Sequence, residues 1–217
     1  MSFKTKKYAF VKNAVSLEVA NLLHGYFSFK KRVLKKYLDD RFLSPFQTDW
    51  GKIGGVSRFI KNSPETYSHY SDILMETVLE KMRPLMEKKT GLKLYPTYSF
   101  ARLYLKGDIL ERHTDRYACE ISATLFLGGD KWPIFVETTK GKSKKRLKIN
   151  FEQGDLLIYR GCELPHWREP LKKKTCFQLF LHYIERGSQK ADENKFDQRP
   201  FLGLATTYRQ GSQYDVD

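Results

Sequence analysis

The sequence predicts an α+β protein in which a helical first part packs outside an antiparallel β sandwich or barrel. Two observations carry this prediction. Apolar residues recur at helical spacing up to Gly91, and after it they alternate with polar residues at the period of a strand. The alternating segments are short and follow one another without a helical stretch between them. We therefore expect one domain over residues 1–217, with a helical part at 1–92, a β part at 93–185 and a polar tail at 186–217.

The helical part is predicted to begin with an edge strand at residues 8–11. Ser16 suits the N-cap of a helix whose apolar face includes Leu17 and Phe27, because its hydroxyl can accept a free backbone N–H. A second helix is predicted over residues 28–42, followed by a loop at 44–61 that is rich in glycine.

A third helix is predicted to start at Ser63, with Pro64 in its first turn. Apolar residues at helical spacing continue from residue 72 to residue 86, with a kink expected at Pro84. Gly91 suits the end of this helix, because glycine readily adopts a left-handed conformation.

The β part is predicted to contain short strands separated by Gly, Asp, Asn and Lys turns. The first of them is long or broken in two. The predicted strands are residues 93–105, 121–127, 133–138, 146–151, 156–159 and 176–184.

The chain is basic, with 39 Lys and Arg against 25 Asp and Glu, a net charge of +14 and a pI near 9.6. A field of this sign attracts nucleic acid, acidic peptides and small anionic co-substrates. The basic hairpin tip at residues 140–148 is the best single segment for meeting an acidic partner.

Three cysteines without metal-type spacing, Cys119, Cys162 and Cys176, favour a reducing compartment over a disulfide framework. Residues 1–15 have no apolar core of the kind a secretion signal contains. No apolar run approaches the ~20 residues that cross a bilayer. We expect a soluble, intracellular protein of the cytoplasm, with no membrane partner.

The residue types at positions 113, 115 and 166 suit a metal. His113 and Asp115 are two apart, so in an extended segment their side chains project from the same side. His166 lies in a connection between two later strands, which in a rolled sheet can reach the same edge. Two imidazoles and one carboxylate, with other positions left open, are the ligand set of non-haem Fe(II) oxygenases. We predict a metal site formed by these three residues.

The segments around these ligands resemble the prolyl 4-hydroxylase-like branch of the 2-oxoglutarate- and Fe(II)-dependent dioxygenases. The resemblance rests on residues 102–105 leading through Gly107 to His-Thr-Asp at 113–115, and on the Gly-Asp strand 154–159 that precedes His166. It spans residues 98–185. It implies a double-stranded β-helix, a cupin-like jelly-roll barrel, with a helical N-terminal support region.

The resemblance also implies the chemistry. Fe(II) would be bound by His113, Asp115 and His166, with 2-oxoglutarate and O2 as co-substrates and ascorbate as a reductant. The implied reaction hydroxylates an unactivated C–H bond, in first place that of a prolyl residue in a protein or peptide. Succinate and CO2 are the products of 2-oxoglutarate.

One departure from the family concerns the basic residue that pairs with the far carboxylate of 2-oxoglutarate. The family usually places Lys or Arg about ten residues after the second histidine, where this chain has Cys176. Lys174 has the same strand parity as Cys176, while Arg102 shares a strand face with Tyr104. Tyr104 matches the family tyrosine that often contacts the co-substrate. We therefore predict that Tyr104 binds 2-oxoglutarate together with either Lys174 or Arg102.

Further residues near the predicted ligands are assigned to the substrate or to support of the ligands. They are Arg116, Trp167, Arg168 and Gln178. Arg116 and Arg168 are also open as partners of the co-substrate. His182 shares a strand face with Gln178, and we expect it to be a hydrogen-bonded interior residue and not a fourth ligand.

Two other functions are compatible with the sequence. The net charge and the basic hairpin suggest oxidative demethylation of nucleic-acid bases, which predicts salt-sensitive binding to oligonucleotides. A cupin-like module that keeps a metal without turnover is the non-enzymatic alternative.

Overall fold

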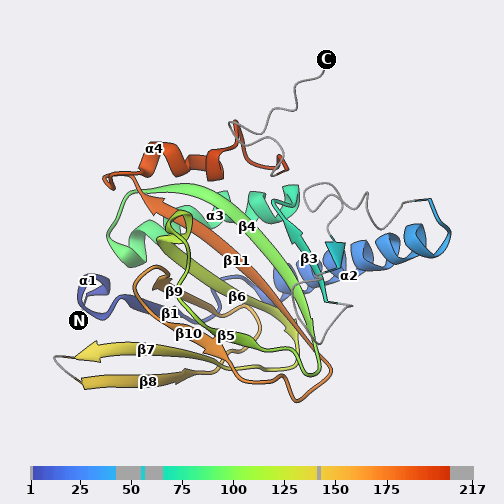
Figure 1. Cartoon of the computed structure of the whole chain (residues 1–217), viewed down its shortest axis with the longest axis horizontal. Helices are drawn as coiled ribbons and strands as arrows, with labels where there is room; N and C mark the ends of the chain where they lie inside the picture. The colour runs from blue at the N-terminus through green and yellow to red at the C-terminus, as the bar shows by residue number, and fades with distance from the viewer. Residues whose placement is uncertain (1, 43–54, 57–65, 141–142, 206–217) are drawn as a thin grey trace.

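The computed structural model describes residues 2–42, 55–56, 66–140 and 143–205. Their strands form two antiparallel sheets (Figure 1). The large sheet, in spatial order, consists of β1 (Tyr8–Val11), β9 (Leu156–Arg160), β6 (Ile121–Gly129), β11 (Thr175–Glu185), β4 (Leu94–Leu105), β3 (Tyr67–Tyr70) and β2 (Gly55–Val56). The small sheet consists of β5 (Leu110–His113), β10 (His166–Arg168), β7 (Ile134–Lys140) and β8 (Ser143–Ile149).

The helices are α1 (Phe3–Lys6), α2 (Leu17–Asp39), α3 (Ile73–Thr90) and α4 (Ala191–Asn194), with short 3-10 turns at Tyr117–Cys119 and Lys195–Gln198. In Figure 1, α2 and α3 lie behind the large sheet. No helix within the described ranges combines the length and apolar composition that crossing a bilayer requires.

The helices, the large sheet and the small sheet form three layers. They pack through two separate apolar cores, one on each face of the large sheet. Along β11, Phe177, Leu179 and Leu181 belong to the core shared with α2 and α3. Cys176 and Phe180, which alternate with them, belong to the core between the two sheets. The period of two seen in the sequence therefore divides each central strand between a helix-covered face and a face that looks onto the small sheet.

The predicted fold class is confirmed, with one refinement. Hydrogen-bonded pairing links no strand of the large sheet to one of the small sheet in the described residues, so the jelly roll is a sandwich of two facing sheets. All six predicted strands are present, and the pairing of β7 with β8 forms the predicted basic hairpin, whose residues 141 and 142 lie outside the described part.

The N-terminal part is less purely helical than predicted. The edge strand at residues 8–11 is confirmed as β1, which pairs with β9. The helix predicted to start at Ser63 was wrong over Tyr67–Tyr70, which form strand β3 and pair with β4. Residues 62–65 of that prediction lie outside the described ranges. Pairing with a neighbouring strand overrides local propensity here. The predicted loop at 44–61 also falls largely outside the described residues.

The helix ends follow side-chain capping. Ser16 accepts the N–H of Val19 at the start of α2, as predicted. This helix runs unbroken to Asp39, so the two predicted helices are one, and Leu17 is exposed instead of buried. The start of α3 is capped by Asp72, and its end at Gly91, with φ of 75°, is as predicted.

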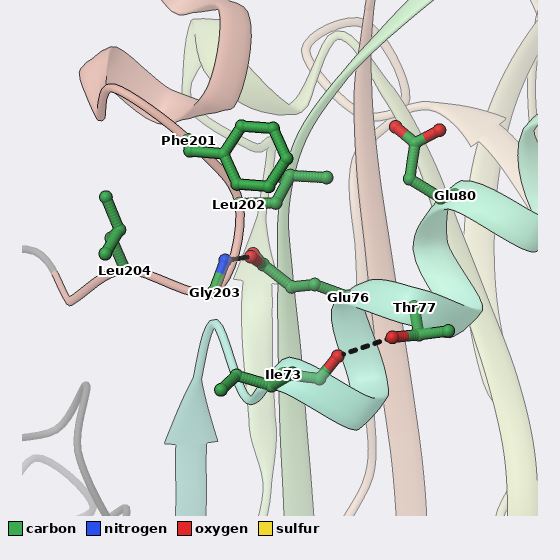
Figure 2. Close-up of a pocket in the computed structure, with 8 residues that line it drawn as sticks. All are labelled: Ile73, Glu76, Thr77, Glu80, Phe201, Leu202, Gly203 and Leu204. Atoms are coloured by element: carbon green, nitrogen blue, oxygen red, sulfur yellow. Dashed lines mark hydrogen bonds between the residues drawn. The ribbon is translucent and has the colours of Figure 1, made fainter.

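The tail folds back onto α3. Arg199 Nη2 donates to Glu76 Oε1 over 2.9 Å, and both side chains are buried. Figure 2 shows Glu76 reaching the backbone N–H of Gly203 beside a cavity of about 400 Å³, which contains none of the predicted site residues. Leu202 packs against the helix-side core, while Phe201 is exposed.

Candidate metal centre

The two histidines of the predicted site are placed by strand pairing. His113 is the last residue of β5 and His166 the first of β10, and they are direct cross-strand partners. Their ring centroids lie 4.3 Å apart. Neither short strand was predicted from the sequence. The antiparallel register, and not the sequence spacing, brings the two imidazoles together.

Asp115 lies two residues beyond the end of β5. Its backbone N–H donates to the carbonyl of Gly161 over 2.9 Å, which turns the chain so that the carboxylate faces both histidines. Oδ1 of Asp115 is 3.5 Å from Nε2 of His113 and 3.5 Å from Nε2 of His166. The three predicted ligands are therefore brought together at one edge of the sandwich.

The tautomers of both histidines follow from their hydrogen bonds. Nδ1 of His113 lies 2.8 Å from the carbonyl oxygen of Glu111, and Nδ1 of His166 lies 2.9 Å from that of Leu164. A carbonyl can only accept, so each Nδ1 carries the proton. In the neutral imidazoles both Nε2 lone pairs then point toward Asp115, which is the arrangement a metal-binding histidine needs.

The second oxygen of Asp115 is fixed by a neighbouring strand. Ser122 Oγ, on β6, donates to Oδ2 of Asp115 over 2.7 Å. The same Oγ lies 3.0 Å from Nδ1 of His182, which is the hydrogen-bonded interior role expected for that histidine. Tyr159 adds a hydroxyl 3.4 Å from Nε2 of His166. Side chains from the large sheet thus contact a ligand set whose two histidines lie on the small sheet.

The charges at the site keep the carboxyl ionised. Burial alone would raise the pKa of Asp115, but His113 and His166, when they carry a proton on the Nε2 atom that faces its Oδ1, hold it well below its usual range. The neighbouring carboxylate in turn raises the pKa of His113. A metal would take the place of the proton between Nε2 and Asp115. Burial lowers the pKa of His182 to about 4, so this histidine is neutral at physiological pH.

Gly161 is required by close approach. A Cβ built there would lie 2.3 Å from Oδ2 of Asp115 and 2.4 Å from the carbonyl oxygen of Cys119. Both distances are far inside van der Waals contact, and the second involves backbone that cannot move aside. The position of the carboxylate therefore depends on a residue with no side chain at position 161.

The donor set fits a divalent metal. The ligand atoms of His113, Asp115 and His166 lie within 4.8 Å of one another. At bond lengths of about 2.0–2.2 Å, two neighbouring ligands of an octahedral ion lie about 3 Å apart, so the 3.5 Å separations between the carboxylate and each imidazole need only a small inward shift. Two nitrogen ligands and one oxygen ligand leave half of an octahedron free.

The structure places some of the residues predicted to bind 2-oxoglutarate between the sheets and one of them on the surface. Tyr104 is buried in the core between the sheets, and Arg102 stacks on its ring at 4.7 Å. Lys174 is not brought to the interior: it precedes β11, its side chain is exposed, and its backbone N–H donates to Asp130. The strand parity that favoured Lys174 does not apply, because the residue lies outside the strand.

The other predicted residues have distinct settings. Arg116 forms a two-pronged ion pair with Asp197 at 2.7 and 2.8 Å. Gln178 accepts from Thr124 over 2.9 Å in the buried interior. Trp167 lies on the face of β10 opposite His166 and stacks on Phe135, and its assignment to the substrate stays a prediction.

Arg168 is the predicted residue with the most unusual environment. It shares its face of β10 with His166 and is 1% exposed. Its Nη1 donates to the carbonyl of Trp132, whereas Nε and Nη2 are buried and have no hydrogen-bond partner among the residues that the structure describes. Burial lowers its pKa from the ordinary value for arginine.

Several supporting residues were not predicted from the sequence. Ser122, Tyr159 and Gly161 contact the ligands only because of strand register and a close backbone approach. A serine or glycine in a strand-rich segment carries no signal of such a role by itself.

Comparisons by sequence identify no relatives: no protein-family model and no curated protein matches this chain. Solved structures do match. A prolyl-4-hydroxylase from Pseudomonas putida has a TM-score of 0.55 at 17% identity, over 85% of this chain and 96% of that one. A prolyl hydroxylase from Trichoplax adhaerens, in complex with a hypoxia inducible factor peptide fragment, has a TM-score of 0.56 at 12% identity, over 86% and 90%.

A third match extends the range of chemistry. The non-haem α-ketoglutarate-dependent epimerase SnoN from nogalamycin biosynthesis has a TM-score of 0.58 at 14% identity, over 84% of this chain and 79% of that one. At these identities the likeness shows the fold alone. The chain has the jelly-roll fold of the 2-oxoglutarate- and Fe(II)-dependent oxygenases, prolyl hydroxylases among them, as the sequence resemblance implied.

Proposed function

We propose that this protein is an Fe(II)- and 2-oxoglutarate-dependent dioxygenase that hydroxylates an unactivated C–H bond. The observation that carries the proposal is the convergence of the Nε2 atoms of two histidines and the carboxylate of Asp115 at the edge of a jelly roll. The fold of the 2-oxoglutarate-dependent oxygenases supports it independently.

The residues of this chain would bind the metal and keep it correctly ligated. His113, Asp115 and His166 would hold Fe(II) on one side, leaving the opposite positions for co-substrate and O2. When bound, iron couples the decarboxylation of 2-oxoglutarate by O2 to insertion of one oxygen atom into a C–H bond, with succinate and CO2 released. The carbonyls of Glu111 and Leu164 would keep each histidine in the ligating tautomer.

The interior beside the ligands suits a reaction that must exclude water. Apolar and aromatic side chains fill the space between the sheets, including Phe126, Leu157 and Phe180. Such a lining strengthens the interactions of charged groups inside it and keeps bulk water from the reacting atoms.

The finer proposal is that the substrate is a prolyl residue in a protein or peptide. It is supported by the two prolyl hydroxylases with this fold, one of which binds a peptide. The competing substrate class is small molecules, because the epimerase from nogalamycin biosynthesis has the same fold. Demethylation of nucleic-acid bases stays a prediction that rests on the net charge and the basic hairpin.

The test is oxygen-dependent succinate formation. Purified protein would be supplied with Fe(II), 2-oxoglutarate and ascorbate, with and without proline-containing peptides, and succinate would be quantified. We expect slow succinate release that a true substrate accelerates and that Asp115→Ala abolishes. Release that is equal in wild type and Asp115→Ala would refute the enzyme proposal and favour a metal-binding module without turnover. Stimulation by small molecules but by no peptide would refute the prolyl assignment.

A further inference from the structure

Arg168 is a buried cation whose counter-charge is not supplied by the described residues. The residue is 1% exposed, and the ion pairs of the described chain include none to Arg168. One backbone carbonyl, that of Trp132, accepts from Nη1, while Nε and Nη2 are left without partners. Five donors in a fixed fork are therefore mostly unused, on the same strand face as His166.

The surroundings of Arg168 make this deficit costly. The guanidinium lies over the rings of Trp132 at 5.0 Å and Phe151 at 5.5 Å, within the apolar core between the sheets. Aromatic faces attract a cation but accept no conventional hydrogen bonds. A buried charge persists in proteins when it is paired and hydrogen-bonded, so this site is complete only with an anion that accepts from Nε and Nη2.

Arg168 also occupies the neighbourhood of Cys176. Cys176 and Tyr104 are cross-strand partners on β11 and β4, and both side chains line the core between the sheets. The charge of Arg168 acts electrostatically on both of these groups. A cation that enters from β10 thus lies beside the position on β11 where this chain has an uncharged cysteine.

We infer that Arg168 binds the distal carboxylate of 2-oxoglutarate, as a two-pronged anchor that takes the place of a basic residue at position 176. This inference rests on the proposed function. Arginine presents two parallel donors that match a carboxylate, and here Nε and Nη2 are the pair without partners.

The spacing along β10 agrees with a dicarboxylate of this length. At a rise of about 3.3 Å per residue, the Cα atoms of His166 and Arg168 lie about 6.6 Å apart on one strand face. A five-carbon chain can extend from the open side of the ligand set to a cation at that separation. Tyr104, on which the charge of Arg168 acts, would contact the same end of the molecule.

Arg102 is the rival anchor and supplies the matched control. Its Nε and Nη2 are also buried without partners, but the residue is partly exposed and its guanidinium stacks on Tyr104. Partial exposure lets water share its charge, so it does not require an internal anion as Arg168 does.

The experiment compares a dicarboxylate with its one-carboxylate analogue. Fe(II)-loaded protein is titrated without oxygen with 2-oxoglutarate and with 2-oxopentanoate, which has the same chain length and no distal carboxylate. Calorimetry gives both affinities. The variants are Arg168→Met, Arg102→Met and the double variant Arg168→Met with Cys176→Lys.

We expect wild type and Arg102→Met to share a strong preference for 2-oxoglutarate. Arg168→Met should lose about 10- to 100-fold in 2-oxoglutarate affinity, the range for hydrogen bonds to a charged group, with little change for 2-oxopentanoate. The double variant should recover part of the preference for 2-oxoglutarate over 2-oxopentanoate, because it replaces the lost cation on β10 with a lysine on β11. Thermal unfolding without ligand should show Arg168→Met at least as stable as wild type, because it removes an unpaired buried charge.

The outcomes separate this inference from the proposed function. If wild type binds 2-oxoglutarate and Arg168→Met keeps its affinity and preference, Arg168 is not the anchor and the proposed function still stands. Loss of preference in Arg102→Met alone would also overturn the inference. Absence of 2-oxoglutarate binding to wild type would refute the proposed function itself. If Arg168→Met does not fold, Arg168→Gln carries the same comparison, with the same loss expected.

Discussion

Two buried arginines of this protein are alike in exposure and unlike in partners. Arg199 and Arg168 are 3% and 1% exposed, and each guanidinium lies 5.0 Å from an aromatic ring. Arg199 donates to the carboxylate of Glu76 and to the carbonyls of Thr97 and Leu204. Arg168 donates to one carbonyl.

The difference separates a structural charge from a functional one. Arg199 ties the tail to α3 and β4, and its ion pair is completed within the chain. Arg168 lies between the sheets on the strand face of the predicted ligand His166, where a charge without a partner among the described residues can bind an external anion. A perturbed, incompletely partnered group in the interior marks a functional site more reliably than burial alone.

The largest expected effect comes from breaking the completed pair. Arg199→Met should lower the free energy of unfolding by about 3–5 kcal/mol, because it leaves the buried carboxylate of Glu76 without its cation. Urea unfolding measures this directly. Adding Glu76→Gln to Arg199→Met should recover part of the loss. If Arg199→Met lost less free energy of unfolding than Arg168→Met, the comparison between the two arginines would be reversed.

Removing a ligand should affect the metal and leave the fold intact. Asp115→Ala should weaken Fe(II) binding by about 100-fold or more, above the 10- to 100-fold range of residues that only orient ligands. Anaerobic metal titration measures it, with the exposed Asp192→Ala as a control that should bind metal like wild type. Wild-type affinity in Asp115→Ala would show that the carboxylate is not a ligand.

The residue that orients Asp115 should have a smaller effect. Ser122→Ala removes the donor to Oδ2, and we expect about 10-fold weaker Fe(II) binding with the protein still folded. Thr124→Val, on the same strand and hydrogen-bonded to Gln178, is the matched control and should retain wild-type metal affinity. Equal losses in both variants would indicate a general effect of altering β6.

The smallest expected effect is on the pH dependence of folding stability, through Asp72 at the start of α3. Burial alone would raise the pKa of Asp72, but hydrogen bonds from His69 and Lys30 hold it below its usual 3.8. A depressed folded-state pKa stabilises the protein above the unfolded-state value, and this stabilisation is lost as pH falls below it. Asp72→Asn should therefore show a shallower loss of stability on acidification than wild type. Parallel curves would contradict the assignment.

The fold could largely be predicted because burial imposes its period on the sequence. The change at Gly91 from helical spacing to alternation marks the boundary between α3 and β4. The strands that were missed, β2, β3, β5 and β10, have two to four residues each, too few to show a period, and they are fixed by pairing with neighbouring strands.

The grouping of the candidate site could be predicted from the sequence, but the choice of a cation to bind the co-substrate could not. His113, Asp115 and His166 are residue types that bind metals, and the structure brings these three together. Whether a cation is exposed like Lys174 or buried like Arg168 depends on tertiary packing, which spacing does not encode. That no carboxylate of the described residues pairs with Arg168 can likewise be known only from the structure around it.

The measurement that tests the central claim most directly is the visible absorption that arises when 2-oxoglutarate chelates protein-bound Fe(II). Wild-type protein would be loaded with Fe(II) without oxygen and titrated with 2-oxoglutarate. We expect the absorption to appear and saturate in wild type, and to be absent in Asp115→Ala under the same conditions. No absorption in folded wild-type protein, or equal absorption in the variant, would contradict the assignment of His113, Asp115 and His166 as an iron site open to 2-oxoglutarate.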